Sequence, residues 1–437
     1  MSLIGKADRD HLESDMPEAT RISLPYGDHS LSIDVPSENL LGVILPKTNA
    51  EERPDETEMI RAALENPIGS PPLRQLAHIG QRVAIVISDL TRPCPSDRLL
   101  PFVLQELAAA GIPDEDIFIV LALGLHRLMT EAEIDRLVSQ EVHRRIQVLN
   151  HNLEDVVSLG VTSRGTPVEI FRPLVEADLR VCLGNLEFHW FAGYSGGAKA
   201  VLPGCASRKT IIANHGLMVQ PGVGSGRHQG NPLREDLEEG AAMLGVDFIL
   251  NVVVDGQHRL LSAVAGEVTA AHRGGCQEIA RRGKVKIERQ ADIVVASAGG
   301  FPKDINLLQA HKGMENAAYF VRAGGALILA AECREGMGNP IFEEWMLAAS
   351  SPADILERIQ KEFVLGGHKA AGIANIERRV KVYLVSSFSD EWVRQRLFMT
   401  PAAEPQQALQ AAFQELGRDS QVLVLPEAVS IIPDFDK

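Results

Sequence analysis

Short apolar runs alternate with helix-like patterns along the first two thirds of the chain. Residues 97–110 carry leucines at helical spacing, and Gly111 and Pro113 end that pattern. Near-continuous Val, Ile and Leu runs separated by amphipathic helices are typical of a parallel sheet that is covered on both faces. The runs predicted as strands are 83–88, 116–123, 145–150, 179–184 and 247–254.

A second set of the same kind fills the last third of the chain. Alternation on either side of Gly27-Asp28 also predicts a β-hairpin over 21–35. We place a boundary near 285 and expect two Rossmann-like α/β domains, 1–285 and 286–437, whose parallel sheets face an interdomain cleft, the usual place of a small-molecule site. The predicted strands of the second set are 291–297, 325–331, 381–387 and 421–425, with helices near 306–321, 339–363 and 404–417.

Composition narrows the class of protein. The 437 residues include 43 Lys and Arg against 58 Asp and Glu, a formal charge of −15 that argues against nucleic-acid or anionic-membrane partners. No apolar run approaches the ~18–20 residues of a membrane helix, and Met1 to Ser14 has no apolar signal core. Five scattered cysteines without a CxxC pair fit a reducing compartment and rule out a disulfide framework. We therefore expect a cytoplasmic protein.

Polar residues gather where three predicted strands end. The segments are Asp89-Leu90-Thr91-Arg92 after 83–88, Gly124-Leu125-His126-Arg127 after 116–123, and Asn185 to His189 after 179–184. Ligands of open parallel sheets bind beyond the carboxyl ends of the strands. Each segment alone is more typical of a capped turn, but three at equivalent positions favour one shared site.

A glycine-rich loop follows the third of these segments. It runs from Gly193 through Ser195, Gly196 and Gly197 to Lys199, and Pro203-Gly204 closes it. Glycines let backbone N–H groups approach an anion, and a lysine balances its charge. The spacing matches neither GxxxxGK[ST] nor GxGxxG. Lys199 could clamp a phosphate or anchor a cofactor covalently; a tight surface turn is the alternative.

Further candidates have weaker support. His215 ends a predicted helix that begins at Arg208, where a structural cap is more usual, and Cys205 is more typical of an apolar filler than of a metal ligand. Gln309 and Lys312 lie three residues apart on one helical face and could deliver an amide and an ammonium to a cleft. The histidines without such context are expected at the surface: His11, His29, His143, His228, His258 and His272.

Four of these motifs occur in an order that resembles the nickel-dependent lactate racemase family. The most specific is HWFAGYSGGAKAVLPG at 189–204, followed by the histidine at 215. The others are DxTRPxP at 89–95, GxHR at 124–127 and QxxK at 309–312. The resemblance covers essentially the whole chain.

That resemblance implies two α/β domains around a nickel pincer nucleotide, a Ni(II)-pyridinium-3,5-bisthiocarboxylic acid mononucleotide. By position, Lys199 corresponds to its covalent anchor, His215 to the fourth nickel ligand, and His126 and His189 to the catalytic pair. The family's cofactor-binding positions are implied at Asp89, Leu90, Thr91, Arg92, Ser195, Gly196, Gly197, Lys199, Gln309 and Lys312, and its substrate-binding positions at Arg92, Gln309 and Lys312.

The implied reaction inverts C2 of a 2-hydroxy acid by proton-coupled hydride transfer through a planar 2-keto acid. Two imidazoles suit it because histidine accepts and returns protons near neutral pH. Arg92 and Lys312 would neutralise the substrate carboxylate. The implied partners are a small 2-hydroxy acid and cofactor-biosynthesis proteins.

Two departures leave the identity of the hydroxy acid open. Leu308 stands where the lactate enzyme has a tyrosine, and 365–375 lacks the tryptophan of that enzyme but carries His368 and Lys369. The extra cation suits a larger acid or one with a second carboxylate. Two other functions remain to be weighed: a pyridoxal phosphate enzyme with a Schiff base at Lys199, and a non-catalytic nucleotide- or sugar-binding module.

Overall fold

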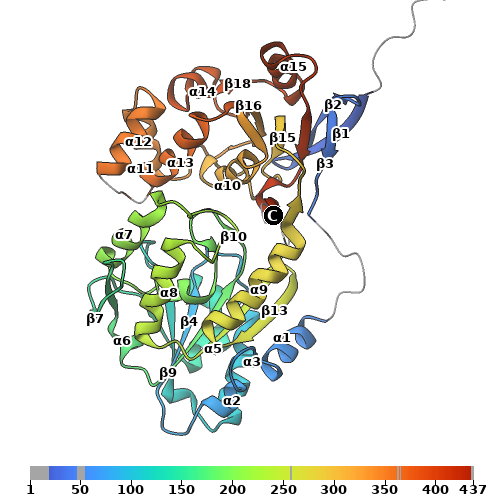
Figure 1. Cartoon of the computed structure of the whole chain (residues 1–437). Coiled ribbons are helices and arrows are strands. Elements are labelled where there is room, and N and C mark those ends of the chain that lie inside the picture. Colours follow the sequence, from blue (N-terminus) through green and yellow to red (C-terminus); the bar gives the residue numbers. More distant parts are fainter. Residues whose placement is uncertain (1–18, 47–54, 256–257, 362–363, 365, 435–437) are drawn as a thin grey trace, which may run out of the picture. The chain divides into compact units, whose positions relative to one another are not determined.

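The computed structural model describes residues 19–46, 55–255, 258–361, 364 and 366–434. Within these, the chain divides into two compact units, shown in Figure 1. Unit 1 takes its described residues from Met1–Leu45, Val285–Lys361 and Gly366–Lys437, and unit 2 from Pro46–Lys284 and Glu362–Leu365. Each unit is built on a six-stranded sheet.

The sheet of unit 2 has the order β13-β12-β9-β4-β5-β6. All neighbours are parallel except β13, which is antiparallel to β12. The five runs predicted as strands are confirmed, and β13 is an addition. The strands are β4 (Val83–Ser88), β5 (Ile117–Ala122), β6 (Gln147–Asn150), β9 (Leu179–Asn185), β12 (Phe248–Val254) and β13 (Leu260–Gly266).

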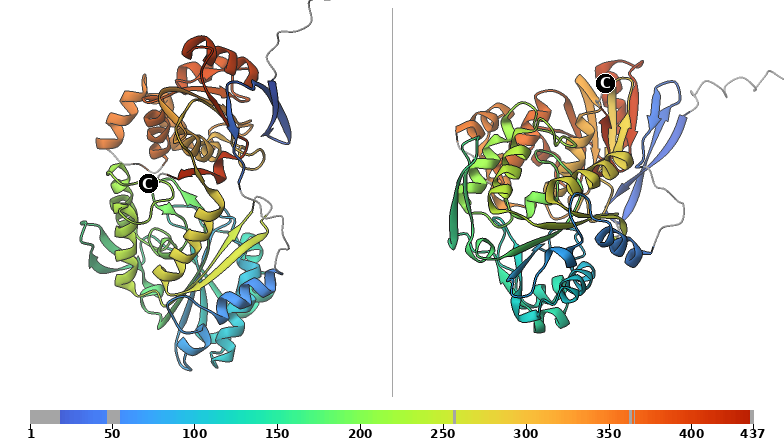
Figure 2. Two further views of the ribbon diagram at one scale, coloured as in Figure 1. Left: turned by 45° about the vertical axis from the view of Figure 1, so that its right-hand side comes forward. Right: turned by 60° about the horizontal axis from the view of Figure 1, so that its bottom comes forward.

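Helices bury both faces of this sheet, as Figure 2 shows. In β4, Ile85 and Ile87 join one apolar cluster and Ala84 and Val86 the other, because successive side chains of a strand point to opposite faces. This double burial explains the unbroken apolar runs. The helices are α1 (Glu56–Glu65), α2 (Leu73–Leu76), α3 (Ser96–Ala109), η1 (Asp114–Asp116), α4 (Glu131–Val138), α5 (Gln140–Arg145), α6 (Arg172–Val175), α7 (Arg208–Gly216), η3 (Leu217–Val219), α8 (Pro232–Leu244) and α9 (Val268–Gly283).

Two small hairpins complete unit 2. Strands β7 (Val156–Val161) and β8 (Pro167–Phe171) form one, and β10 (Phe188–His189) and β11 (Gly193–Tyr194) form the other. The second hairpin leads directly into the short 3-10 helix η2 (Gly197–Ala200). The predicted glycine loop therefore begins in a hairpin and ends in a helical turn.

The sheet of unit 1 has the order β18-β17-β16-β15-β19-β3, with every neighbour parallel. The predicted strands are present, although β16 begins at Val321 rather than at 325. The strands are β3 (Leu40–Val43), β15 (Ala291–Ser297), β16 (Val321–Ala330), β17 (Lys381–Val385), β18 (Thr400–Pro401) and β19 (Val422–Leu425), and β14 (Lys284–Lys286) and β20 (Ile432–Asp434) are short.

The N-terminal strands belong to unit 1, whereas the sequence placed them in a domain of residues 1–285. The predicted hairpin forms from β1 (Ala19–Tyr26) and β2 (His29–Pro36), and it buries Ile22, Leu24, Ile33 and Val35 in the core of unit 1. Strand β3 then pairs with β19. The apolar face of a hairpin does not specify its distant partner, and this is why the assignment differed.

The helices of unit 1 also differ from prediction in one place. The segment 339–363 holds two helices because Ser351 caps a new helix that begins at Pro352: its hydroxyl accepts the N–H of Asp354, whose carboxylate accepts the backbone N–H groups of Ser350 and Ser351. Residues 362 and 363 lie outside the described part. The helices are α10 (Leu307–Ala318), α11 (Pro340–Ala348), α12 (Pro352–Lys361), α13 (Gly367–Glu377), α14 (Asp390–Arg396), α15 (Pro405–Leu416) and η4 (Ala428–Ser430).

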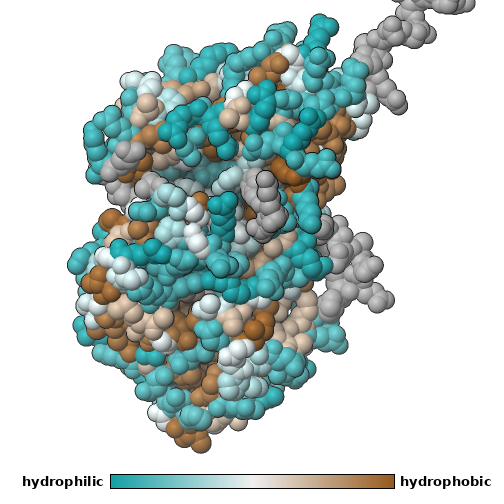
Figure 3. Space-filling view, in the orientation of Figure 1, coloured by the Kyte–Doolittle hydropathy of each residue, from teal (hydrophilic) through white to brown (hydrophobic). Residues whose placement is uncertain are grey.

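The described part of the chain contains no helix with both the length and the apolar character that a membrane crossing requires. The face drawn in Figure 3 is mostly hydrophilic, with apolar residues interspersed. Large exposed apolar side chains occur on both units, among them Leu128 and Phe301.

Asp304 offers a test of how the hairpin is held in unit 1. Its buried Oδ2 accepts the backbone N–H groups of Gly27, in the hairpin turn (2.7 Å), and of Glu332 (3.1 Å). Replacing Asp304 by Ala should lower the free energy of unfolding by about 2 kcal/mol, because two charge-assisted bonds are lost in the interior. Urea denaturation of the full chain measures this. Asp28→Ala in the same turn, which removes only an exposed ion pair with Arg334, should change it by less than ~1 kcal/mol; equal losses would contradict the assignment.

Candidate functional site

The three polar segments leave the same edge of the unit 2 sheet. Strand β4 has β5 and β6 on one side and β9 and β12 on the other. The chain order therefore reverses between β4 and β9, and open α/β sheets bind ligands at the carboxyl end of such a reversal. Residues 89–92 follow β4, residues 124–127 follow β5, and residues 186–189 follow β9.

Asp89 and His126 form the first pair at this edge. The Nδ1 atom of His126 lies 2.6 Å from Oδ2 of Asp89, which is only 2% exposed. The other oxygen accepts the backbone N–H and the hydroxyl of Thr91, at 2.8 and 2.6 Å. Burial opposes the ionisation of Asp89, but the hydrogen bonds of His126 and Thr91 outweigh it and lower the pKa of Asp89. An ionised Asp89 holds a proton of His126 at Nδ1, so in the neutral ring Nε2 is an acceptor.

The remaining residues of this segment face outward. Leu90, Thr91 and Arg92 are exposed, and the backbone N–H of Arg92 closes a turn onto the carbonyl of Asp89 at 3.2 Å. Among the described residues, the guanidinium of Arg92 makes no ion pair, so its charge is available to an anionic ligand.

The glycine loop needs its glycines for steric reasons. At Gly193 (φ +75°), a Cβ atom would lie 1.8 Å from the carbonyl oxygen of Arg227. At Gly197 (φ +58°), it would lie 2.7 Å from the ring of His272. A side chain at either position would displace the backbone, since both also have the left-handed conformation that glycine alone adopts without strain.

Ser195 and Gly197 use their donors inside the protein. The hydroxyl of Ser195 donates to the carbonyl of Asn185 and accepts the N–H of Glu187, both at 2.8 Å. The N–H of Gly197 donates to Oδ1 of Asn251 at 2.7 Å. These donors fasten the loop to the end of β9 and to the middle of β12. Ser195 and Gly197 therefore shape the site and do not offer these groups to a ligand.

Three of the predicted side chains converge on the ring of Phe191. The ring centroids of His189 and His215 lie 4.3 and 4.9 Å from its centroid, and the Nζ atom of Lys199 lies 5.5 Å from it. These residues come from β10, α7 and η2, and Phe191 itself is buried. The fold thus brings together the two histidines and the lysine that the sequence separates by up to 26 positions.

His215 is held in its neutral form. Burial and, to a lesser degree, the positive charge of Lys199 lower its pKa to about 3. A neutral imidazole keeps a nitrogen lone pair and can therefore bind a metal ion. The adjacent Asn214 fixes this part of α7, because its amide donates to Asp236 at 2.7 Å and to the carbonyl of Leu233 at 3.2 Å.

Gln309 and Lys312 lie in unit 1, whereas the other predicted site residues lie in unit 2. Both are on the first turns of α10 and are half-buried. Asn306 caps this helix by accepting the N–H of Gln309 at 3.0 Å. Cys205 is fully buried within an apolar cluster of unit 2, as expected of a filler.

The sequence missed a buried polar network behind the glycine loop. His272, predicted at the surface, is completely buried, and its Nε2 lies 2.9 Å from the carbonyl oxygen of Ser195. Arg234 is also fully buried and donates to the carbonyl of Tyr194 at 3.2 Å and to Nδ1 of His272 at 3.2 Å. Glu238 balances the charge, with Nε of Arg234 at 2.5 Å and Arg273 at 2.7 Å.

The electrostatics of this network fix the state of His272. Burial and the neighbouring Arg234 hold the pKa of His272 well below its usual value. The ring is therefore neutral, with Nδ1 accepting from Arg234 and Nε2 donating to Ser195. The one signal in the sequence is Arg234 followed by Glu238 four residues later, a spacing that in a helix is more often that of a solvated ion pair.

Comparisons with known proteins match both parts of the chain. Residues 26–226 match the lactate racemase N-terminal domain, and residues 286–433 match the lactate racemase C-terminal domain. A lactate racemase of Thermoanaerobacterium thermosaccharolyticum is 34% identical over 421 residues, covering 94% of this chain and 98% of that protein. One of Lactiplantibacillus plantarum is 31% identical, covering 94% and 99%.

Solved structures agree with the sequence matches. The lactate racemase apoprotein from T. thermosaccharolyticum superposes with a TM-score of 0.88, at 34% identity, over 95% of this chain and 100% of that one. A Thermotoga maritima protein with a TM-score of 0.63 and 18% identity, over 90% and 100%, shares the fold alone. By sequence over both domains and by structure, the chain belongs to the lactate racemase family of isomerases.

Proposed function

We propose that this protein inverts C2 of a 2-hydroxy acid with a nickel pincer nucleotide attached to Lys199. The observation that carries the proposal is the convergence of His189, His215 and Lys199 on the ring of Phe191. The match to racemases over both domains favours this function over a Schiff-base enzyme or a non-catalytic binding module.

The residues present fit such a group. Among the described residues, no cluster of three or more His, Cys, Asp or Glu side chains could hold a metal ion by itself. A nucleotide that brings three donors to nickel needs only one ligand from the protein, and the neutral imidazole of His215 can supply it. The Nζ atom of Lys199 and the ring of His215 both lie against the ring of Phe191, so one bound group could contact both residues.

The side chains of this protein would transfer the hydroxyl proton of the substrate. When bound, the nucleotide supplies an electron-poor ring that accepts hydride from C2 of the substrate. His126 offers an acceptor at Nε2, because Asp89 binds its Nδ1, and takes the hydroxyl proton of the substrate. His189 has the opposite arrangement in this structure: its Nδ1 accepts the N–H of Ala192 at 3.3 Å, so a neutral ring carries its proton at Nε2.

That asymmetry assigns different tasks to the two rings. A ring with a free acceptor removes a proton, and a ring with an N–H holds the substrate oxygen by a hydrogen bond. For the opposite enantiomer the tasks must exchange, and His189 must then release Ala192. Arg92 in unit 2, and Gln309 and Lys312 in unit 1, are proposed to bind the substrate, with the two cations on its carboxylate.

Lys199 gives the direct test of cofactor attachment. Protein produced together with the cofactor-biosynthesis proteins should carry a mass addition on Lys199 and bound nickel, and Lys199→Ala should carry neither. Intact mass, peptide mapping and metal analysis measure this. Lys209→Ala is the control, since Lys209 is an exposed lysine on α7 and its loss should change nothing. An unmodified wild-type Lys199 without nickel would refute covalent attachment.

The two histidines test the catalytic assignment separately. His126→Ala or His189→Ala should reduce racemisation by roughly a hundredfold or more, because each removes one partner in proton transfer. Nickel content and the mass addition on Lys199 should stay at the wild-type level in both. A chiral assay over a panel of 2-hydroxy acids, with His143→Ala as a control outside the site, measures the effect. Wild-type rates in either variant would remove that residue from the mechanism.

Asp89 tests the orientation of His126. Asp89→Asn should lower kcat by roughly tenfold to a hundredfold, because an amide no longer fixes the proton of His126 at Nδ1, while nickel binding is kept.

The folded-state pKa of Asp89 lies below its unfolded value. Its contribution to stability is therefore present above the unfolded pKa and is lost as the pH falls through the folded pKa. Denaturation curves of the variant and the wild type should converge in acid; a constant difference would contradict this.

A further inference from the structure

Helix α7, which carries His215, is packed against its neighbours mainly through polar side chains. Of its nine residues, all of them described, the buried ones are Thr210, Ile211, Asn214 and His215, and Ile211 alone is aliphatic. The hydrophobic effect is non-directional, so apolar contacts fix the rotation of a short helix less strictly than hydrogen bonds, which require defined distances and angles. The orientation of α7 therefore depends on the partners of its polar side chains.

Hydrogen bonds hold α7 at both of its ends. At the first turn, the hydroxyl of Ser207 donates to Oε2 of Glu169 at 2.6 Å, and the hydroxyl of Thr210 accepts the backbone N–H of Glu169 at 3.0 Å. At the last turn, the amide of Asn214 donates to Oδ2 of Asp236 at 2.7 Å. The first turn is thereby bound to β8 and the last turn to α8.

Asp236 is a fully buried acid that is surrounded by uncharged donors. Its Oδ1 accepts the hydroxyl of Thr162 at 2.5 Å, and its Oδ2 accepts the hydroxyl of Thr166 at 2.8 Å as well as the amide of Asn214. Among the described residues Asp236 forms no ion pair, although buried acids are normally paired with a cation. Its three donors come from the turn between β7 and β8 and from α7, so this one carboxyl group joins that turn, α7 and α8.

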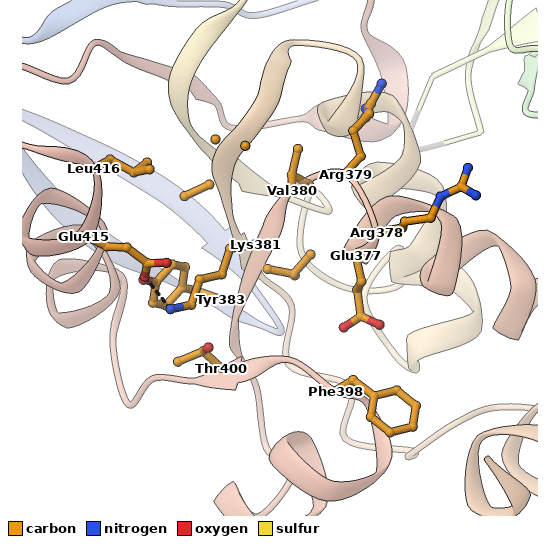
Figure 4. Close-up of a pocket in the computed structure, with 14 residues that line it drawn as sticks. Glu377, Arg378, Arg379, Val380, Lys381, Tyr383, Phe398, Thr400, Glu415 and Leu416 are labelled. Atoms are coloured by element: carbon orange, nitrogen blue, oxygen red, sulfur yellow. Dashed lines mark hydrogen bonds and ion pairs between the residues drawn. The ribbon is translucent and has the colours of Figure 1, made fainter. Parts of the chain in front are cut away.

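Glu377 in unit 1 shows how different this arrangement is from an acid that is merely buried. Glu377 lines the pocket drawn in Figure 4, and its two oxygens are buried without a hydrogen bond to any described residue. Burial raises the pKa of Glu377 to about 9, so this acid is neutral near pH 7. Asp236 has donors on both of its oxygens, and they fix its position.

Stability alone does not explain why Asn214 occupies its place. The Oδ1 atom of Asn214 is buried and makes no hydrogen bond in the described part of the protein. An unsatisfied buried acceptor costs stability, and so does a buried acid without a cation. An apolar pair at 214 and 236 would avoid both costs. We therefore look for the benefit of Asn214 and Asp236 in the geometry that they impose on α7.

The residue that follows Asn214 on the helix is His215, the proposed nickel ligand. Consecutive helical residues are about 100° apart around the axis, so the bonds of Asn214 also set the direction in which His215 leaves the helix. The Nδ1 atom of His215 is inaccessible, so Nε2 is the nitrogen through which the ring would bind an ion. A rotation of α7 by roughly 20° would move an atom about 6 Å from the axis by about 2 Å, whereas metal–ligand distances vary by only ~0.2 Å.

We propose that Asp236 and Asn214 are positioning residues for His215. The carboxyl group of Asp236 holds the amide of Asn214, and this amide holds the last turn of α7 in the rotation that directs the imidazole toward nickel. The inference rests on the proposed function, because nickel binding is what gives the direction of the imidazole its importance. Ser207 and Thr210 hold the first turn independently, so loss of the bond between Asn214 and Asp236 should displace the last turn without unfolding the helix.

Nickel release from the holoenzyme is the first measurement. The protein is produced together with the cofactor-biosynthesis proteins, and nickel loss into an excess of chelator is followed over time. Asn214→Ala and Asp236→Ala should lose nickel roughly tenfold to a hundredfold faster than the wild type, because a displaced imidazole binds the ion more weakly. Both variants should keep the mass addition on Lys199, which lies on η2 and not on α7.

Thr166→Val is the matched control. It removes another donor from the same carboxyl group of Asp236 but leaves the amide of Asn214 in place. Thermal unfolding should show a lower stability for this variant, as for Asn214→Ala, whereas its nickel should be released at the wild-type rate. If Thr166→Val released nickel as fast as Asn214→Ala, a general loosening of unit 2 would explain the effect and the positioning role would be overturned.

The ring of His215 gives a second measurement that does not involve the cofactor. In full-length protein prepared without the cofactor and with 13C-labelled histidine, the NMR signal of its Cε1–H group is identified by its absence in His215→Gln. Asp236→Ala should shift this signal, because the ring lies 4.9 Å from the ring of Phe191 and the ring current depends on that distance. Thr166→Val should leave the signal unchanged.

The outcomes separate this inference from the proposed function. A wild type without nickel and without the mass addition refutes the proposed function, and the inference with it. A loaded wild type that releases nickel as fast as Asn214→Ala and Asp236→Ala overturns the positioning role alone, and so does an unchanged His215 signal in Asp236→Ala. Should Asp236→Ala fail to fold, Asn214→Ala decides both measurements.

Discussion

The hydrogen bond from Nε2 of His272 to the carbonyl oxygen of Ser195 is the interaction on which the site in unit 2 depends. It fixes the backbone between β11 and η2, and the ring of His272 also occupies the space that a side chain at 197 would need. Lys199 follows two residues later on η2. The position of its ammonium relative to Phe191, and thereby to His189 and His215, is set by a contact made behind the loop.

That contact relies on buried charge. Arg234 is fully buried, and its cost is offset because Glu238 takes its Nε, while the carbonyl of Tyr194 and the ring of His272 take its other donors. Buried ion pairs add little net stability compared with apolar packing. However, any conformation that breaks such a pair is strongly destabilised, because it leaves a buried charge without its partner. The network therefore stabilises one conformation of the glycine loop over the alternatives. Glu377 in unit 1 is the opposite case: its carboxyl oxygens are buried and make no hydrogen bond with any described residue.

The sequence predicted the structural features that depend on local sequence pattern. Buried parallel strands carry unbroken apolar runs, so the main strands of both sheets and the polar segments at the ends of β4, β5 and β9 were found. Features that depend on distant partners were not. Strand β3 joins unit 1 only through β19, about 380 positions away, and His272 looks like any helical histidine until Arg234 and Ser195 surround it. The convergence of side chains on Phe191 could not be predicted either, because a residue in a loop lacks the sequence periodicity from which its contacts could be inferred.

The substrate question turns on Lys369 and its surroundings in unit 1. An additional cation suggested an acid with a second carboxylate, but Lys369 is only 8% exposed and its Nζ lies 3.4 Å from Nδ1 of His311. Burial raises the pKa of the neighbouring Glu315 to about 8, and the charge of Lys369 works against that rise. His311 is held neutral by burial and by the same lysine. Lys369 is thus integrated into an internal cluster, and a second substrate carboxylate would have to compete with His311 and Glu315 for it. Leu308, a half-buried aliphatic residue on α10, is the departure from the family pattern that involves no such competition, because its side chain carries no charge.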